Sequence, residues 1–327
     1  MQPQKILVTG GAGYIGSVLI GQLLHKGYAV RTIDNLSFGS QPLKNYISND
    51  KFEFMQGDIR NRYDCQKATE SIDTIIHLAA IVGDPACQKY PDLAIAVNRQ
   101  GSQNLLDSAN ETQVQRFIFA STCSNYGKMK ETNGYVDEST SLNPVSLYAE
   151  LKVEFEQKLL SLTDTDITPI CLRFATAYGL SPRIRLDLTV NEFTKELALG
   201  RELEVYGEQF WRPYCHTTDI AQAILLAVEA NKEIVSHKAF NVGDTDENYQ
   251  KKTLIDLILS ELPEAKNRVQ YVSKNEDPRD YRVNFDRIKN SLSFENKKRV
   301  IDGIREFIDL IRSKKIEDPD NKIYKNI

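Results

Sequence analysis

The sequence predicts an α/β protein built on a doubly wound, Rossmann-type parallel sheet, with a smaller substrate-binding domain interleaved into it. Two observations lead to this prediction. Short apolar runs alternate with helix-length segments through the first half of the chain, a rhythm typical of parallel sheets covered on both faces. In addition, a glycine-rich loop follows the first apolar run and opens a helix, as at the first turn of such sheets.

The large sheet is predicted from residues 1–178, where strands and helices follow one another. The expected strands are Lys5–Thr9, Tyr28–Asp34, Phe52–Gln56, Thr74–Leu78, Arg116–Ser121 and Ile167–Phe174. The expected helices are Tyr14–His25, Leu93–Ala109 and Pro144–Leu160. Right-handed crossovers should connect the strands, because a right-twisted strand followed by a right-handed helix packs back onto the sheet in that sense.

After Gly179 the alternation becomes irregular, and this change predicts the second domain. We assign residues 179–212 and 244–312 to the smaller domain and expect the chain to return to the large sheet around 213–243. Further helices are expected at Thr189–Leu199, Asp219–Ala230, Thr253–Leu262 and Val300–Ile311. Residues 313–327 are rich in charge and are predicted to form a frayed tail.

Length and charge exclude several classes of function. A chain of 327 residues has ample material for one large domain or two interleaved ones. The net charge of −4 argues against nucleic-acid binding, which needs a basic surface. No apolar run approaches the ~18 residues that cross a bilayer. The N-terminus leads directly into a strand-like run, so we expect no signal peptide.

The five cysteines are scattered and odd in number: Cys65, Cys87, Cys123, Cys171 and Cys215. The sequence contains no C-x-x-C pair and no His/Cys cluster, so no metal site is predicted. Unclustered thiols in a long chain suit a reducing, cytoplasmic location.

The loop from Thr9 to Gly16 carries the first chemical signal. It contains G-x-G-x-x-G at Gly11, Gly13 and Gly16, and also G-x-x-G-x-x-G starting at Gly10. Glycines let the backbone turn sharply and approach a pyrophosphate, whose charge lies at the helix N-terminus. An ordinary glycine turn is the alternative, but the strand–loop–helix–strand order favours a dinucleotide site. The loop lacks the Gly-Lys-Ser/Thr ending of a phosphoryl-transfer loop, which disfavours ATP chemistry.

Asp34 indicates which dinucleotide is bound. It ends the second strand, 18 residues after Gly16, where an acidic side chain can accept hydrogen bonds from the adenosine ribose hydroxyls. The same charge would repel a 2′-phosphate, so NAD is favoured over NADP. The alternative is a strand-end carboxylate that starts a turn with Asn35.

Tyr148 and Lys152 are the candidate catalytic pair. They stand four positions apart on a predicted helix, so their side chains share one face. A free phenol, with a pKa of about 10, is a poor base at neutral pH, but a nearby ammonium and a positive nicotinamide ring favour the phenolate. Such a tyrosine can take a proton from a sugar hydroxyl while hydride leaves the same carbon for NAD. The alternative is a surface helix pair.

Taken together, the motifs resemble those of extended short-chain dehydrogenases/reductases, the NAD-dependent epimerase/dehydratase family acting on nucleotide sugars. The resemblance covers the chain from Ile6 to about Ile288. It is carried, in order, by Thr9–Gly16, Asp34, Asp58-Ile59, His77-Leu78-Ala79-Ala80, Asn98, Ser121-Thr122, Tyr126-Gly127 and Tyr148-x-x-x-Lys152.

The resemblance implies roles for individual residues. Thr122 would hydrogen-bond the reacting hydroxyl beside Tyr148, and Lys152 would hold the nicotinamide ribose. The cofactor would be bound by Gly10, Gly13, Tyr14, Ile15, Gly16, Asp34, Asn35, Asp58, Ile59, Leu78, Ala79, Ala80, Asn98, Tyr148, Lys152 and Phe174. The nucleotide-sugar substrate would be bound by Thr122, Cys123, Ser124 and Thr176, with Arg183, Arg212 and Arg279 on its diphosphate. Arginine offers phosphate a planar, two-pronged donor, although each could instead form a surface salt bridge.

The chain departs from the family in ways that bear on the reaction. The 4,6-dehydratases carry an Asp-Glu pair where this chain has Cys123 and Ser124, and a serine is too weak an acid to replace them unaided. Cys123 is a possible acid/base for 3,5-epimerisation, but the cysteine of such relatives lies one position further on. The alternative is a small buried thiol. Thr176 stands where most members have Asn.

These features predict an NAD-dependent enzyme that oxidises the sugar C4 hydroxyl, with a nucleotide-sugar 4-epimerase as the first expectation. The alternative is a 4-dehydrogenase or 4-keto reductase, since residues 79–87 and 181–194 more loosely resemble 4-dehydrogenases of GDP-linked heptoses. A 4,6-dehydratase, a 3,5-epimerase and a non-catalytic NAD-binding sensor are less favoured. Relatives often form homodimers through helices that correspond to Leu93–Ala109 and Pro144–Leu160. Leu105, Leu106 and Phe155 would contribute either to that contact or to the core.

Overall fold

The computed structural model describes residues 5–129, 134–163, 165–273 and 279–326. Its main feature is a seven-stranded sheet in the order β10-β6-β5-β4-β1-β2-β3, with every neighbouring pair parallel. The strands are β1 (Lys5–Thr9), β2 (Ala29–Asp34), β3 (Phe52–Gln56), β4 (Thr74–His77), β5 (Arg116–Thr122), β6 (Thr168–Phe174) and β10 (Lys238–Val242). The predicted doubly wound α/β class is therefore confirmed. The strand order reverses between β1 and β4, which places a ligand crevice at the carboxyl ends of these strands.

Helices cover both faces of the sheet because successive strand residues point to opposite sides. Ile6 and Val8 of β1 pack into one core with α1 (Tyr14–His25) and α8 (Thr217–Glu229), while Leu7 packs into the other. The helices on that second face are α2 (Arg62–Thr69), α5 (Ser102–Glu111) and α6 (Leu147–Leu160). Leu105, Leu106 and Phe155 are buried in this second core, so they serve the fold of the single chain.

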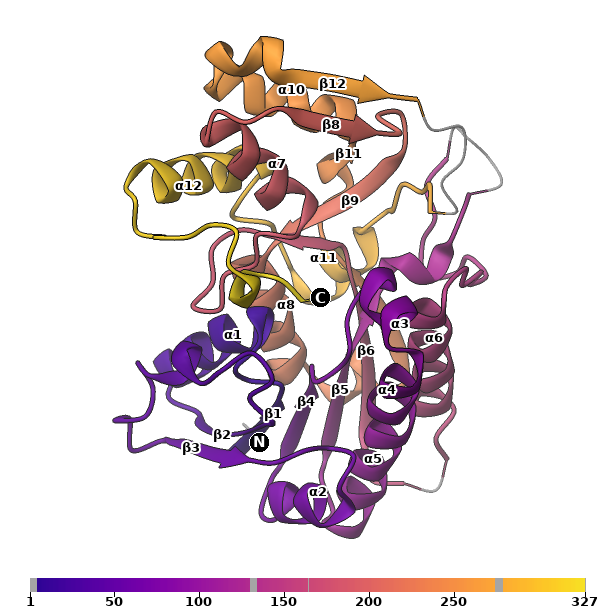
Figure 1. The fold of residues 1–327 in the computed structure, drawn as a ribbon. Helices are drawn as coiled ribbons and strands as arrows, with labels where there is room; N and C mark the ends of the chain where they lie inside the picture. The colour runs from indigo at the N-terminus through magenta and orange to yellow at the C-terminus, as the bar shows by residue number, and fades with distance from the viewer. Residues whose placement is uncertain (1–4, 130–133, 164, 274–278, 327) are drawn as a thin grey trace.

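A second group of elements forms its own core above the carboxyl ends of the large sheet (Figure 1). Its three-stranded sheet has the order β11-β9-β7, and β12 pairs with β8. These strands are β7 (Thr176–Tyr178), β8 (Leu203–Tyr206), β9 (Trp211–His216), β11 (Asn248–Gln250) and β12 (Val269–Val272). The packed helices are α7 (Thr189–Ala198), α10 (Lys251–Glu261) and α12 (Val300–Arg312). Within residues 213–243, the chain joins the large sheet through α8 and β10, whereas β9 pairs with β7 and β11.

Several element boundaries differ from those predicted. The expected helix Leu93–Ala109 is divided into α4 (Pro91–Ala94), a π-helical turn (Ile95–Gly101) and α5. The remaining short helices are α3 (Asp84–Lys89), α9 (Lys232–Val235) and α11 (Asp286–Leu292). Helix α6 begins at Leu147 and not at Pro144, because the Ser146 hydroxyl accepts a hydrogen bond from the Ala149 N–H and caps the helix. The polar helix α2 was not predicted, although Asn61 caps it in the same way.

The prediction of a frayed tail was wrong for residues 313–326, and Ile327 lies outside the described residues. Ile316 is buried in a small cluster with Leu186 and Phe307. The Leu186 N–H donates a 2.8 Å hydrogen bond to the Tyr324 carbonyl, and the Asn326 N–H donates one of 3.0 Å to Asp187 Oδ2. The apolar side chains among the charged ones therefore hold this segment against the 180s loop. In the described part of the chain, no helix is long and apolar enough to span a membrane.

Candidate active site

The glycine-rich loop forms a close-packed turn between β1 and α1. Gly10 has φ +72°, and a Cβ there would lie 2.9 Å from the Ala79 backbone; at Gly16 a Cβ would lie 2.3 Å from the Gly10 carbonyl oxygen. Only glycine satisfies both positions. No side chain caps α1, which begins at Tyr14, so the N-terminal turn keeps its positive end and backbone N–H groups for an anion. This cradle fits the pyrophosphate of a dinucleotide.

Two carboxylates mark the adenosine end of this cradle. Asp34 accepts hydrogen bonds from the Ala12 N–H (3.0 Å) and the Leu36 N–H (2.8 Å), while burial raises its pKa. Asp58 accepts hydrogen bonds from Asn35 and Arg60, and the bond from Arg60 is the main reason that its pKa falls to about 2. Both sites therefore offer hydrogen-bond acceptors where the sequence predicts the adenosine moiety.

The loop after β4 forms the opposite border of the crevice, and two polar side chains hold it. Thr9 Oγ1 accepts hydrogen bonds from the Leu78 and Ala79 N–H groups. Asn98, in the π-helical turn, donates to the Ile81 carbonyl (2.9 Å) and accepts from the Ile81 N–H (2.8 Å). The side chain of Asn98 is thus engaged in positioning the loop that carries Ala79 and Ala80.

The structure brings together the three predicted catalytic side chains. The side chain of Thr122, at the end of β5, lies beside that of Tyr148 and acts on its pKa. The Lys152 ammonium lies one turn further along α6, 6.0 Å from the centre of the Tyr148 ring. It donates a 2.7 Å hydrogen bond to the Ala120 carbonyl and lies 4.6 Å from the centre of the Phe119 ring. Strand β5 and helix α6 therefore position all three groups at the carboxyl end of the sheet.

The charge states differ from the simple expectation of a phenolate stabilised by lysine. Burial, followed by the charges of Cys87 and Asp84, raises the pKa of Tyr148 above its usual value, and this outweighs the lowering by Thr122 and Arg185. Burial also lowers the pKa of Lys152 to about 8. In the protein alone, Tyr148 is consequently a protonated phenol at neutral pH.

The lowered pKa of Lys152 predicts a stability effect. Its folded-state pKa of about 8 lies below the ordinary value, so below pH 8 both folded and unfolded chains hold the proton and the full cost of burying the charge is present. In NAD-free protein at pH 7, we expect Lys152→Met to raise the free energy of unfolding by up to about 3 kcal/mol. Between pH 8 and 10.5 the folded state has released the proton first, so wild-type stability should approach that of the variant.

Urea unfolding of wild type and variant at pH 7 and pH 10 measures this convergence. Lys158→Met, which alters an exposed lysine on the same helix, should show no such pH-dependent difference. A gap between wild type and Lys152→Met that stays constant across this range would contradict the assigned protonation.

The predicted substrate end is built around Tyr281. The Tyr281 hydroxyl lies 3.3 Å from Ser124 Oγ, and the Arg212 guanidinium lies 5.2 Å from the centre of its ring. Burial raises the pKa of Tyr281, and the charges of Arg212 and Arg279 act against this rise. Arg279 also forms a 2.9 Å ion pair with Asp84 of α3. Arg212 and Arg279 therefore both act on Tyr281, whose hydroxyl lies beside Ser124.

Arg183 lies elsewhere. Its guanidinium stacks 4.1 Å above the centre of the Phe38 ring, and its charge acts on Asp34. The described residues show no contact between Arg183 and the other two arginines. The expected group of three arginines is therefore divided between the two ends of the crevice.

Cys123 is a buried thiol, 1% exposed, that donates a hydrogen bond to the Arg173 carbonyl. Burial raises its pKa well above the ordinary value. This environment matches a packing role better than the acid/base role considered from the sequence. Thr176 begins β7, opposite Tyr214, and Phe174 ends β6, so both lie where the large sheet meets the smaller one.

A buried ion pair lies directly behind Thr122. Arg173 and Glu156 have side chains that are 6% and 1% exposed and lie 2.5 Å apart. Glu156 also accepts a hydrogen bond from Ser121, and Arg173 donates a 2.8 Å bond to the Tyr126 hydroxyl. This network connects α6, β5 and β6 immediately behind the catalytic residues.

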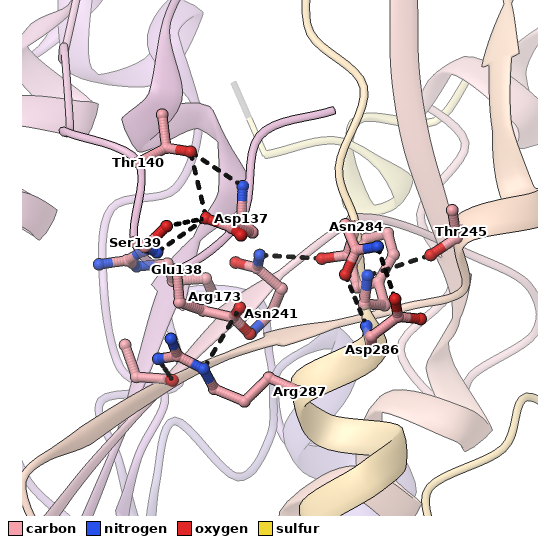
Figure 2. Close-up of polar contacts among 12 residues, drawn as sticks. Asp137, Glu138, Ser139, Thr140, Arg173, Asn241, Thr245, Asn284, Asp286 and Arg287 are labelled. Atoms are coloured by element: carbon pink, nitrogen blue, oxygen red, sulfur yellow. Dashed lines mark hydrogen bonds and ion pairs between the residues drawn. The ribbon is translucent and has the colours of Figure 1, made fainter. Parts of the chain in front are cut away.

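A second buried carboxylate, that of Glu138, holds the segment that follows Tyr126 in the chain (Figure 2). Glu138 accepts a 2.8 Å hydrogen bond from the Asn241 N–H, and its other oxygen lies 3.5 Å from Arg287 Nε. Asn241 in turn donates to the Asn284 carbonyl. Glu138 therefore links the residues after Tyr126 to β10 and α11.

Sequence reasoning did not find four of the residues that shape this site: Asp84, Ser146, Arg185 and Tyr281. Asp84 accepts a 2.6 Å hydrogen bond from Ser146 Oγ in addition to its ion pair, and so joins α3 to the start of the catalytic helix. Of the four, Arg185 had the clearest signal, since it stands two residues after Arg183 in the unusual segment 181–194.

The fold and site together define an enzyme class. A doubly wound sheet with a glycine cradle, an acidic residue at the end of β2, and a Thr–Tyr–Lys group beside the crevice describe a dinucleotide-dependent enzyme that moves a hydride and a proton. The chain belongs to the NAD dependent epimerase/dehydratase family, whose model matches residues 6–243. It is an enzyme, and its cofactor is NAD.

Individual relatives agree with this assignment. The chain is 34% identical over 252 residues to an uncharacterized UDP-glucose epimerase of Bacillus subtilis, covering 74% of this chain and 77% of that protein. It is 31% identical over 259 residues to a UDP-glucose 4-epimerase of Halalkalibacterium halodurans, covering 73% and 75% of the two chains.

Solved structures show the same architecture over nearly the whole chain. A UDP-glucose 4-epimerase of Thermotoga maritima with UDP-glucose superposes with a TM-score of 0.83 and 26% identity, covering 95% of this chain and 99% of that one. A dTDP-glucose 4,6-dehydratase of Streptomyces venezuelae with NAD gives a TM-score of 0.83 and 25% identity, covering 94% and 97%. Epimerases and dehydratases thus share this framework, and the residues of the site must distinguish them.

Proposed function

We propose that the protein is a nucleotide-sugar 4-epimerase. The observation that carries this proposal is the convergence of Thr122, Tyr148 and Lys152 at the carboxyl end of the sheet, facing the crevice that the glycine cradle opens. When bound, NAD supplies a hydride acceptor and a positive ring. The relatives named above as UDP-glucose 4-epimerases support a nucleotide sugar as the substrate.

The chain's own residues carry out the proton transfer. Tyr148, as the phenolate, accepts the proton of the sugar C4 hydroxyl, and Thr122, which lies beside Tyr148, orients that hydroxyl. Because the pKa of Tyr148 is raised in the protein alone, the phenol must first release its own proton to solvent, and a positive charge in the crevice would favour this ionised form. Lys152 holds the nicotinamide ribose and, with its pKa near 8, can relay a proton near neutral pH.

The substrate phosphates are assigned to Arg212 and Arg279. Both lie beside Tyr281 and Ser124, and guanidinium groups bind phosphate with two parallel hydrogen bonds. Cys123 and Ser124 stand where a dehydratase needs an acid and a base. With Cys123 buried against the Arg173 carbonyl, a 4,6-elimination is disfavoured.

One experiment tests the reaction. We would incubate the NAD-loaded protein with UDP-, GDP-, dTDP- and CDP-sugars in deuterated water and identify the products by NMR and mass spectrometry. Inversion at C4 without deuterium incorporation is the expected result. Accumulation of a 4-keto sugar with stoichiometric NADH would instead show a 4-dehydrogenase, and deuterium at C3 or C5 would show proton exchange next to the ketone and return Cys123 to the candidate acid/base groups.

We also propose that the enzyme is a cytoplasmic homodimer. The five cysteines are unpaired and buried, which suits a reducing compartment. The dimer would use the outer faces of the π-helical turn Ile95–Gly101, α5 and α6. The turn and α6 carry the exposed pair Arg99–Glu154, and the exposed Leu93 of α4 precedes the turn. Light scattering of wild type and Leu93→Glu checks the oligomeric state.

A further inference from the structure

Arg183 is a buried cation with an unmet hydrogen-bonding capacity. It is 4% exposed, and among the described residues its buried Nε has no hydrogen-bond partner. The structure shows one hydrogen bond from its guanidinium, a 3.0 Å bond to the Lys325 carbonyl, and no ion pair within the described part of the chain. A buried guanidinium that lacks an anion is costly, so this side chain is typical of a binding group awaiting its ligand.

The loop that carries Arg183 is fixed to the cofactor cradle. The Tyr14 hydroxyl donates a 2.5 Å hydrogen bond to the Gly179 carbonyl, and Ser181 Oγ donates one of 2.7 Å to the Tyr14 carbonyl. Tyr14 is the first residue of α1. The segment 179–187 is therefore held directly beside the helix N-terminus where a pyrophosphate would lie.

The C-terminal segment holds this loop from its outer side. Residues 322–326 meet it at three points: the Tyr324 carbonyl accepts from Leu186, the Lys325 carbonyl accepts from Arg183, and the Asn326 N–H donates to Asp187. In Figure 1 the C-terminus falls between α1 and α3, above the ends of β1 and β4. We call residues 322–326 the C-terminal strap.

The charges around the loop favour an anion. Burial, followed by repulsion from Arg185, lowers the pKa of Arg183 to about 10. Arg185 is paired with Asp187, yet its charge also acts on Tyr14 and on the catalytic Tyr148. The net positive charge of this loop therefore faces the space between the cradle and the catalytic residues.

We propose that Arg183 binds the pyrophosphate of NAD, and that the C-terminal strap holds its loop closed over the bound cofactor. The cofactor would thus lie between the glycine cradle on one side and a guanidinium from the second half of the chain on the other. The proposal rests on NAD binding by the family and is independent of the fate of the sugar. It differs from the expectation, based on the sequence, that Arg183 binds the substrate diphosphate.

Binding measurements with NAD, ADP-ribose, ADP and adenosine test the proposal without any sugar. All proteins are first stripped of cofactor. Compared with wild type, Arg183→Gln should lower the affinities for NAD, ADP-ribose and ADP by roughly ten- to a hundredfold and leave the affinity for adenosine unchanged. Arg183→Lys should give an intermediate loss, because it keeps the charge and loses the fork. Arg312→Gln, which alters an exposed arginine paired with Glu264, should bind all four ligands as wild type does.

A second variant avoids dependence on the buried arginine. Removal of residues 321–327 deletes the strap and should speed the displacement of bound etheno-NAD by excess NAD about tenfold or more, while circular dichroism and the thermal transition of the NAD-free protein stay close to wild type. Equal loss of adenosine affinity in Arg183→Gln would overturn the pyrophosphate contact. Unchanged displacement in the truncated protein would overturn the role of the strap.

Discussion

Tyr148→Phe is expected to lower kcat by about 10²- to 10⁴-fold, the usual contribution of a positioned acid/base group, while NAD affinity changes little. The substitution removes only the hydroxyl that lies beside Thr122 and that would accept the substrate proton. The ring and its neighbours on α6 remain, and none of the contacts that form the glycine cradle involves Tyr148. Steady-state turnover and titration with NAD separate the two effects.

The control is Tyr135→Phe, which removes the hydroxyl of a tyrosine that is 49% exposed and should leave turnover unchanged. The turnover of Thr122→Val should lie between those of Tyr148→Phe and Tyr135→Phe, since this variant loses the hydroxyl that interacts with Tyr148 and keeps the base. If Tyr148→Phe retained wild-type turnover, Tyr148 would not be the acid/base group, and the proposed reaction would lose its central residue.

Arg173→Met is expected to produce the largest loss of stability, about 3–5 kcal/mol in the free energy of unfolding. Glu156 is 1% exposed on its side chain and relies on Arg173 for charge compensation. After the substitution it keeps the hydrogen bond from Ser121 but remains an unpaired charge in the core. Because the pair lies behind Thr122, turnover should fall as well.

Urea unfolding measures this loss of stability, and two further variants serve as comparisons. Arg312→Met breaks an ion pair with Glu264 whose side chains are both 56% exposed, and should cost less than about 1 kcal/mol. The double variant Arg173→Met/Glu156→Leu removes both buried charges and should recover much of the stability lost in the single variant. A cost for Arg173→Met as small as that for Arg312→Met would show that water reaches Glu156.

The fold was largely predictable because its signals are local. Strands such as Lys5–Thr9 and Phe52–Gln56 were predicted with the bounds that the structure has, since each is a compact run bounded by turn residues. Helix α2 was missed because its residues are mostly polar, and it is held in place by its cap and by Cys65 and Ala68 in the core. The break in Leu93–Ala109 was missed because Asn98 bonds to Ile81, a contact that no helical periodicity reveals.

The features of the candidate site likewise fall into those that local sequence predicts and those that depend on contacts between distant residues. The sequence by itself determined the glycine cradle, the acidic end of β2 and the Tyr148–Lys152 spacing, because each lies within a few residues or one helical turn. Only the tertiary structure decided that the loop carrying Arg183 is bonded to Tyr14 at the start of α1, that Cys123 is buried against β6, and that Leu105, Leu106 and Phe155 serve the core. These outcomes depend on contacts between distant parts of the chain, such as the 165 positions between Tyr14 and Gly179 and the 142 between Arg183 and Lys325. Burial and charge at such positions are set by whichever surfaces the folded chain brings together, and no local pattern encodes them.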